Sequence, residues 1–441
     1  MQKSELYKMN WRRFDLTDLK RNLQYERRRI EVTYSKTFIN LFKWVIISLI
    51  IGIIVGFTGT AFHISIEKAT EIREKYPFII WFLPFGGIFI VWFYKIMKLE
   101  HDKGTNMVLM TVRQNSGMSL KNMICIFVGS TVTHLFGGSS GREGAALQIG
   151  GSVAYQFGKI INLDEYDLRI ITMCGMSAGF SSLFGTPAAA SFFAMEVISI
   201  GILHYSAIVP CIVSAVTAFG ISSQFGVKAV SWLVEIPDIT VISIVKTAVI
   251  ALLCGALSYI FCITMKNTGL LYKHFIKNKY LKIIIAGFAV ALLTFITGTT
   301  DYNGTGMKVI SRVFENQAGY EVFILKIIFT ALTLSAGFKG GEIVPVFFTG
   351  AAFGSALSGI TGLPCSLCAG IGLVSLFCGV TNCPITSMFL SIELFGSEGI
   401  IYFAVACAVS YMTSGYEGLY SEQKILYSKF QPKFIDKKIG R

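Results

Sequence analysis

Four glutamates lie deep in apolar sequence, where an ionised carboxylate is costly. They are Glu143, Glu196, Glu342 and Glu393. Moving a carboxylate into hydrocarbon costs ~2.5 kcal/mol or more, so an acidic residue within a membrane segment is by default a candidate for function. Such a group can take up and release protons, and it can compete with an anion for one site.

Two of these glutamates, Glu143 and Glu342, each end a glycine-rich turn at the expected start of a helix. Glu143 follows the sequence GGSSGR, and Glu342 follows the sequence GFKGG. Free backbone N–H groups at a helix N-terminus attract anions, and glycine permits the tight turn that exposes them. We therefore interpret Glu143 and Glu342 as gating and proton-transfer residues beside an anion site.

The other two glutamates each follow a proline by nine residues. Pro187 precedes Glu196, and Pro384 precedes Glu393. Buried carboxylates are commonly hydrogen-bonded, and backbone N–H groups at a helix end are suitable donors. For this pair we favour a structural role, as braces of helix ends, over a role in transport.

These landmarks form an internal repeat. The offset from Glu143 to Glu342 is 199 residues, and the offset from Pro187 to Pro384 is 197. The near-constant offset predicts two homologous halves, at about 44–225 and 240–420, and such repeats are typical of transporters. Many apolar runs are short and broken by glycine, as in 123–136, 170–184, 188–202 and 346–357. These runs predict helices that end inside the bilayer, where irregular backbone is tolerated only if it is buried or lines a cavity.

Composition supports a polytopic α-helical membrane protein. The chain has 441 residues, of which 53% are hydrophobic and only 15% charged, whereas soluble domains carry about 25% charged residues. Ten of the thirteen excess positive charges lie in residues 1–43 and 421–441. Positive charge that flanks apolar sequence is typical of cytoplasmic segments, so both termini are expected on the cytoplasmic side of the cell membrane. We expect the protein to contact membrane lipid and to have no nucleic-acid partner.

Other chemistry has little support in the sequence. The five histidines show no metal-ligand spacing. A cluster of four cysteines in residues 365–383 has apolar neighbours, which favours packing over zinc binding. No pair of nucleophile and base is evident. We therefore expect no metal, no cofactor and no enzymatic activity.

Several motifs together resemble the CLC family of anion channels and anion/proton exchangers. GREG places Glu143 at the family's gating position, and FGTPAAASFFAMEV resembles the stretch in which exchangers carry two adjacent glutamates, although Val197 replaces the second. GGEIVP resembles a segment that supplies backbone N–H groups to the anion, and GLYS places Tyr420 at the coordinating tyrosine. The resemblance covers about residues 104–420. It implies two inverted halves of short, tilted and broken helices, a homodimer, one anion pathway per subunit and cytoplasmic termini.

The resemblance also implies a set of anion-binding residues. Thr105 and Asn106 stand in the poorest match, GTNMV, where the family usually has GSGIP. The full set implied by the four motifs is Thr105, Asn106, Arg142, Gly144, Ile343, Val344 and Tyr420. The domain layout expected from it is a basic segment at 1–43, a transmembrane domain at 44–420 and a short basic tail at 421–441, with no CBS domains.

Two departures from the family pattern bear on the transported ion. Glu342 stands where an apolar residue is usual, and Val197 replaces the second glutamate. Together they resemble the bacterial branch that exports fluoride in exchange for protons, and this is the function we favour. The alternatives are a CLC chloride channel or chloride/proton exchanger and, from another class, a secondary transporter of an organic solute.

Overall fold

The structure is a computed structural model that describes the backbone of residues 16–100 and 102–439 and the side chains from residue 36 onward. The chain divides into two units, residues 1–47 and 48–441. The basic segment expected at 1–43 falls within the first unit, and its residues 1–15 lie outside the described part. The packing and the sites described below belong to the second unit.

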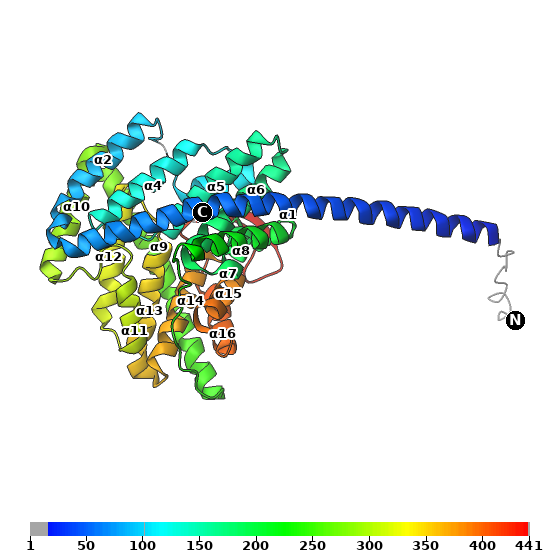
Figure 1. Ribbon diagram of the computed structural model, residues 1–441. Coiled ribbons are helices and arrows are strands. Elements are labelled where there is room, and N and C mark those ends of the chain that lie inside the picture. The colour runs from blue at the N-terminus through cyan, green and yellow to red at the C-terminus, as the bar shows by residue number, and fades with distance from the viewer. Residues whose placement is uncertain (1–15, 101, 440–441) are drawn as a thin grey trace. The chain divides into compact units, whose positions relative to one another are not determined.

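The described elements fall into two runs of eight helices, in keeping with the predicted repeat (Figure 1). The first run is α1 (Leu16–Lys75), α2 (Leu83–Ile96), α3 (Thr105–Gln114), α4 (Leu120–Leu135), α5 (Glu143–Ile160), α6 (Glu165–Phe184), α7 (Pro187–Glu196) and α8 (Ile208–Gln224). The second run is α9 (Val241–Phe275), α10 (Lys279–Thr297), α11 (Met307–Glu315), α12 (Tyr320–Ala336), α13 (Ile343–Thr361), α14 (Cys365–Thr381), α15 (Pro384–Phe395) and α16 (Ile400–Thr413). Short 3₁₀ turns lie at Pro77–Phe82 and Tyr205–Ala207.

Equivalent helices in the two runs begin and end at residues of similar conformation. α7 and α15 both begin at a proline, a residue that suits the first helical position because its missing N–H would have no partner there. The helices before them, α6 and α14, both end in a left-handed residue, Gly185 with φ 69° and Asn382 with φ 60°. The fold is thus the inverted repeat of short and broken helices that the sequence predicted.

Close packing of α5 on α6, and of α13 on α14, depends on glycine. A Cβ at Gly175 would lie 2.2 Å from the carbonyl oxygen of Gly150, and a Cβ at Gly372 would lie 2.1 Å from that of Gly350. These four positions are equivalent in the two halves. Small residues at such interfaces let membrane helices approach closely, which explains why glycine is frequent in the apolar runs.

Glu196 and Glu393 brace the two halves against each other, as the sequence predicted. The Glu196 carboxylate accepts hydrogen bonds from Ile385 N at 3.1 Å and from Thr386 N at 2.8 Å, at the start of α15. In return, the Glu393 carboxylate accepts bonds from the first N–H groups of α7, both at 2.8 Å. Each carboxylate thus satisfies N–H groups that have no partner within their own helix.

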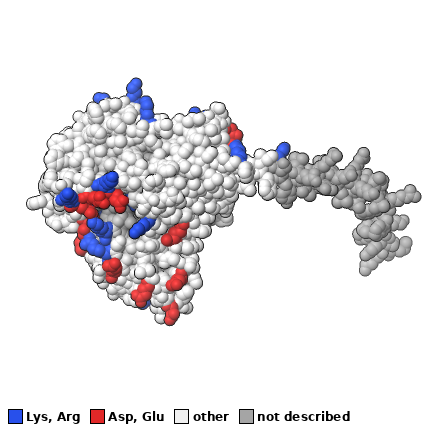
Figure 2. Space-filling model, viewed as in Figure 1, with Lys and Arg blue, Asp and Glu red and all other residues white. Residues whose placement is uncertain are grey.

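Six helical segments among the described residues are long and apolar enough to cross a membrane. They are 36–75, 77–96, 205–224, 241–275, 279–297 and 343–361. Figure 2 shows charged side chains gathered in clusters, with a wide uncharged stretch between them. An uncharged stretch of this kind, together with the many large apolar side chains that are exposed, fits a multi-pass membrane protein.

Three details differ from the sequence-based expectations. α1 extends well beyond the apolar run 44–64, because a helix continues through polar sequence once it has formed. The run 188–202 is broken after Glu196, and Ser199–Ile200 forms the strand β1. The expected tail is a folded hairpin of β2 (Lys424–Tyr427) and β3 (Phe434–Lys438); β2 pairs in parallel with β1 and antiparallel with β3.

Candidate anion site

The N-termini of α3, α5 and α13 meet at one place in the second unit. Gly141 and Gly341, which precede α5 and α13, form an antiparallel bridge in which each N–H donates to the other's carbonyl, at 2.6 and 2.8 Å. A Cβ at Gly144 would lie 2.9 Å from Gly341 Cα and 3.1 Å from Thr105 Oγ1. The three helix starts therefore direct their free N–H groups and positive dipole ends into a common region, as an anion requires.

Glu143 is fully buried at the first position of α5. Its Oε2 accepts a hydrogen bond from Arg142 N at 3.1 Å, while its Oε1 has no hydrogen-bond partner among the described residues. The Arg142 side chain reaches Oε1 only loosely, with Nε at 3.5 Å. One oxygen of this buried carboxylate is thus hydrogen-bonded and the other has only a loose ion pair, which suits a group that must change its position or its proton.

Glu342 is the N-cap residue of α13, yet its side chain makes no capping hydrogen bond. Its Oε2 lies 3.8 Å from where a Cβ at Gly144 would stand, so the carboxylate approaches the start of α5. It also lines a cavity of about 430 Å³ together with Lys266, Glu417 and Ser421. The purely structural alternative, in which Glu342 caps α13, gains no support from this geometry.

Tyr420 completes the arrangement from the other end of the chain. Its side chain is buried, and no hydrogen-bond partner for its hydroxyl is present in the described part of the chain. Its neighbours in the chain, Leu419 and Ser421, line the same cavity as Glu342. A buried donor without a partner is rare in proteins and calls for a ligand, a water or an ion.

Comparison with known proteins identifies the family to which this chain belongs. The sequence model of the family described as voltage gated chloride channels matches residues 86–415, well over half of the chain. The chain belongs to the CLC family. Membership removes the alternative of an organic-solute transporter on another fold.

Individual CLC relatives cover most of this chain. A chloride/fluoride channel protein of Pseudomonas syringae pv. tomato is 32% identical over 395 residues, which make up 88% of this chain and 87% of that protein. The crystal structure of a CLC-type fluoride/proton antiporter is similar with a TM-score of 0.83 and 33% identity, covering 87% of this chain and 98% of that one. The H(+)/Cl(-) exchange transporter ClcA of Vibrio cholerae is 24% identical over 407 residues, or 82% of this chain and 83% of ClcA.

Most of the residues expected to bind the anion in this CLC protein converge on the site. Thr105 and Gly144 contact each other there, with Thr105 Oγ1 at 3.5 Å from Gly144 O. Ile343 and Val344 occupy the first turn of α13, where backbone N–H groups have no partner within the helix.

Two of the residues expected to bind the anion, Arg142 and Asn106, make side-chain hydrogen bonds to other parts of the protein. Arg142 donates from Nη1 to His63 Nδ1 at 3.0 Å and from Nη2 to the Leu183 carbonyl at 3.3 Å. Asn106 Oδ1 accepts a hydrogen bond from Glu422 N at 3.0 Å. Arg142 therefore adjoins the anion site through its backbone N–H and the loose ion pair of its Nε with Glu143. The Asn106 side chain holds the segment that carries Tyr420.

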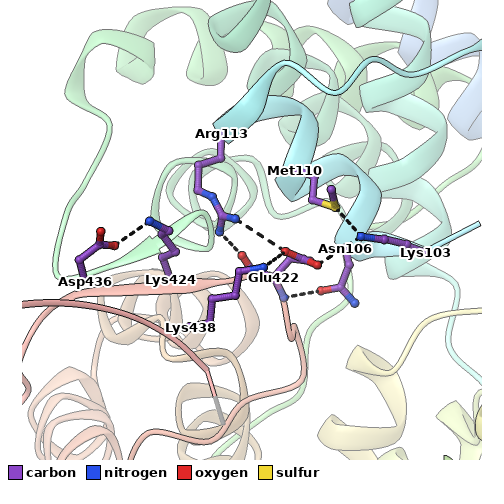
Figure 3. Close-up of polar contacts among 8 residues, drawn as sticks. All are labelled: Lys103, Asn106, Met110, Arg113, Glu422, Lys424, Asp436 and Lys438. Carbon is purple, nitrogen blue, oxygen red and sulfur yellow. Dashed lines mark hydrogen bonds and ion pairs between the residues drawn. The ribbon is translucent and has the colours of Figure 1, made fainter. Parts of the chain in front are cut away.

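Glu422 is a positioning residue that the sequence analysis missed (Figure 3). Its carboxylate lies 3.0 Å from Lys438 Nζ in β3, 3.4 Å from Lys103 Nζ before α3 and 3.7 Å from Arg113 Nη2 at the end of α3. The hydrogen bond from Lys438 lowers the pKa of the Glu422 carboxyl, so the group stays ionised at neutral pH. Glu422 thereby ties both ends of α3 to the hairpin just after Tyr420. No sequence signal indicated it, because its partners are distant in the chain.

Gln148 is the second missed residue. Its Nε2 donates to the Gly144 carbonyl at 3.1 Å and to Thr105 Oγ1 at 3.4 Å, so it links the start of α5 to α3. It stands four residues after Gly144, on the same helix face, and this spacing could have singled it out.

Replacing Tyr420 with Phe tests the assignment of the unpartnered hydroxyl. The change removes one donor and keeps the ring that packs in the site, so fluoride affinity measured by calorimetry should fall roughly tenfold, as expected for a hydrogen bond to a charged group. Thermal stability should stay close to that of the unmodified protein, because the hydroxyl makes no bond within the described residues. Unchanged affinity would mean that the hydroxyl does not reach the anion.

Proposed function

We propose that this CLC protein exports fluoride across the cell membrane in exchange for protons. The observation that carries the proposal is the approach of two carboxylates, Glu143 and Glu342, to one set of helix N-termini, beside the segment that carries Tyr420. The names of two relatives give independent support, a chloride/fluoride channel protein and a fluoride/proton antiporter.

In the proposed mechanism, Glu143 and the anion compete for the positive ends of α5 and α13. While ionised, Glu143 occupies the place of an anion and blocks the pathway. Protonation makes it neutral, removes its attraction to the helix N-termini and lets an anion take its place. Proton uptake and anion movement are thereby coupled at one side chain.

Glu342 provides the preference for fluoride in this proposal. When protonated it can donate a hydrogen bond, and fluoride is a stronger acceptor than chloride. The cavity of about 430 Å³ that Glu342 lines gives its proton a route to bulk water that does not pass Glu143. Glu342 can therefore exchange its proton without the participation of Glu143.

We further propose a layout in which residues 1–43 and 421–441 lie in the cytoplasm and residues 44–420 form the transport domain. The excess of Lys and Arg in both end segments supports this orientation. We expect a homodimer with one pathway per subunit and no enzymatic activity, as the family resemblance implies.

A passive chloride channel is the second candidate. It is favoured by Val197, a buried apolar side chain next to Glu196 at a position where exchangers of the family carry a carboxylate. In that case Glu342 would have no role in proton movement.

Ion efflux from liposomes separates the two candidates. Purified protein is reconstituted into liposomes loaded with equal fluoride and chloride, and the release of each ion is followed with a selective electrode. The exchanger predicts that fluoride efflux exceeds chloride efflux. Chloride efflux that is the larger of the two would support the channel and contradict the proposal.

A further inference from the structure

A second cavity, of about 700 Å³, lies away from the candidate anion site. Its walls are the ends of α2 and α9, the start of α10, the loop around residues 99–103 and the turn that leads into α13. Six of the lining residues are lysines: Lys95, Lys103, Lys273, Lys279, Lys282 and Lys339. We call this cavity the lysine pocket.

The positive charge of the lysine pocket is only partly balanced. Of the two carboxylates that line it, Asp102 pairs with Lys339 at 3.0 Å and Glu100 with Lys279 at 3.5 Å. Lys103 reaches Glu422, at 3.4 Å. The other three, Lys95, Lys273 and Lys282, have neither an ion pair nor a side-chain hydrogen bond with any described residue. Like charges that share one cavity repel each other, and a multivalent or strongly charged anion would relieve that repulsion.

The surface next to the pocket is apolar and faces outward. α2 and α10 pack side by side, with Pro84 against Gly287, and both are long and apolar enough to lie in a membrane (Figure 1). Beyond the pocket's own lysines, the exposed side chains near it on these helices include four large apolar ones: Trp92 and Ile96 on α2, and Leu281 and Ile285 on α10. A ligand with an anionic head and an apolar tail fits this combination, whereas a soluble anion would use only the lysines.

We propose that the lysine pocket binds the phosphate headgroup of an anionic phospholipid, whose acyl chains lie along the apolar faces of α2 and α10. Basic pockets between membrane helices are suited to such headgroups, and lysine is an effective phosphate ligand. Tyr94 adds an aromatic wall, with Lys339 Nζ 4.1 Å from its ring centre. The headgroup supplies the negatively charged partner that Lys95, Lys273 and Lys282 do not have among the described residues.

The pocket is joined to the candidate anion site through Lys339. This residue stands three positions before Glu342, in the turn that begins α13, and its N–H donates to Thr133 Oγ1 at 3.2 Å. A headgroup bound beside Lys339 therefore stabilises the turn from which Glu342 projects. The lipid site itself does not depend on which ion the protein transports.

Native mass spectrometry of the purified full chain tests the proposal, with phosphatidylglycerol as the probe and phosphatidylcholine as the zwitterionic reference. The test variant is the double change Lys273→Gln and Lys282→Gln, which removes two lysines without protein partners. We expect phosphatidylglycerol binding to fall roughly thirtyfold, since each lysine near an anionic headgroup contributes about fivefold. The matched control is Lys121→Gln with Lys159→Gln, two exposed lysines outside the pocket, which should bind as the unmodified protein does.

Three outcomes would overturn the proposal. An equal loss in the control variant would mean that the lipid responds to total charge and not to the pocket. Equal binding of phosphatidylcholine would remove the role of the anionic headgroup. Full displacement by an equal concentration of soluble glycerol 3-phosphate would assign the pocket to a soluble phosphate compound, because the apolar faces of α2 and α10 would then contribute nothing.

Discussion

Glu143→Gln protein is expected to carry anions without moving protons. Glutamine has nearly the shape of a protonated glutamate but cannot release a proton, so the competition between carboxylate and anion is lost. The buried position of Glu143 at the start of α5, with Oε1 held only by a loose ion pair, allows the neutral side chain to leave the helix N-termini. In liposomes, fluoride efflux should persist while the accompanying proton flux falls to the level of protein-free membranes.

Glu67→Gln is the matched control for this experiment. Glu67 is an exposed carboxylate of α1 whose Oε2 lies 3.6 Å from His63, the histidine that contacts Arg142. The change removes the same charge from the neighbourhood but not from the proposed gate, so coupling should survive. Proton-coupled transport that continues unaltered in Glu143→Gln protein would show that Glu143 is not the gating residue.

Glu342→Gln protein is expected to lose most of its fluoride transport while remaining as stable as the unmodified protein. The amide can still form hydrogen bonds but cannot carry a proton. Because Glu342 makes no capping bond, its replacement should cost little stability. We expect the fluoride efflux rate to fall roughly tenfold or more, because coupled transport needs a proton that the amide cannot carry. Efflux and the melting temperature should be measured on the same preparation.

Glu417→Gln separates proton transfer from general effects of charge in the cavity. Glu417 lines the same cavity as Glu342 and pairs loosely with Lys266 at 3.9 Å. Its replacement should leave fluoride efflux near the unmodified level. If both variants lost transport equally, or if Glu342→Gln protein kept normal fluoride flux and proton coupling, the proposed role of Glu342 would be wrong.

The parts of the fold that could be predicted from sequence are those set by local signals. The repeat was visible because proline at a helix start and glutamate nine residues later act within one short helix, α7 or α15. The bracing role of Glu196 and Glu393 followed from the same positions. The placing of Glu143 and Glu342 beside an anion site followed from the glycine-rich turns that precede them at helix starts.

The parts that could not be predicted depend on contacts between distant segments. Residues 421–441 looked like a basic tail because their strands are short and their partner, β1, has only two residues. Glu422 gave no signal because its three basic partners come from the loop before α3, from α3 and from β3. The six lysines of the lysine pocket contribute to net charge in the sequence, but only the packing of α2, α9 and α10 with the adjoining loop and turn brings them to one cavity.

The central claim, that fluoride and proton movements are coupled, is tested most directly by an imposed fluoride gradient. Liposomes that contain the unmodified protein are loaded with fluoride and placed in fluoride-free buffer at the same pH, with the membrane potential clamped to zero by valinomycin and equal potassium. The account predicts that fluoride efflux drives protons inward and acidifies the lumen against the proton gradient that develops. Fluoride efflux with no change of luminal pH would contradict it and leave a passive channel in its place.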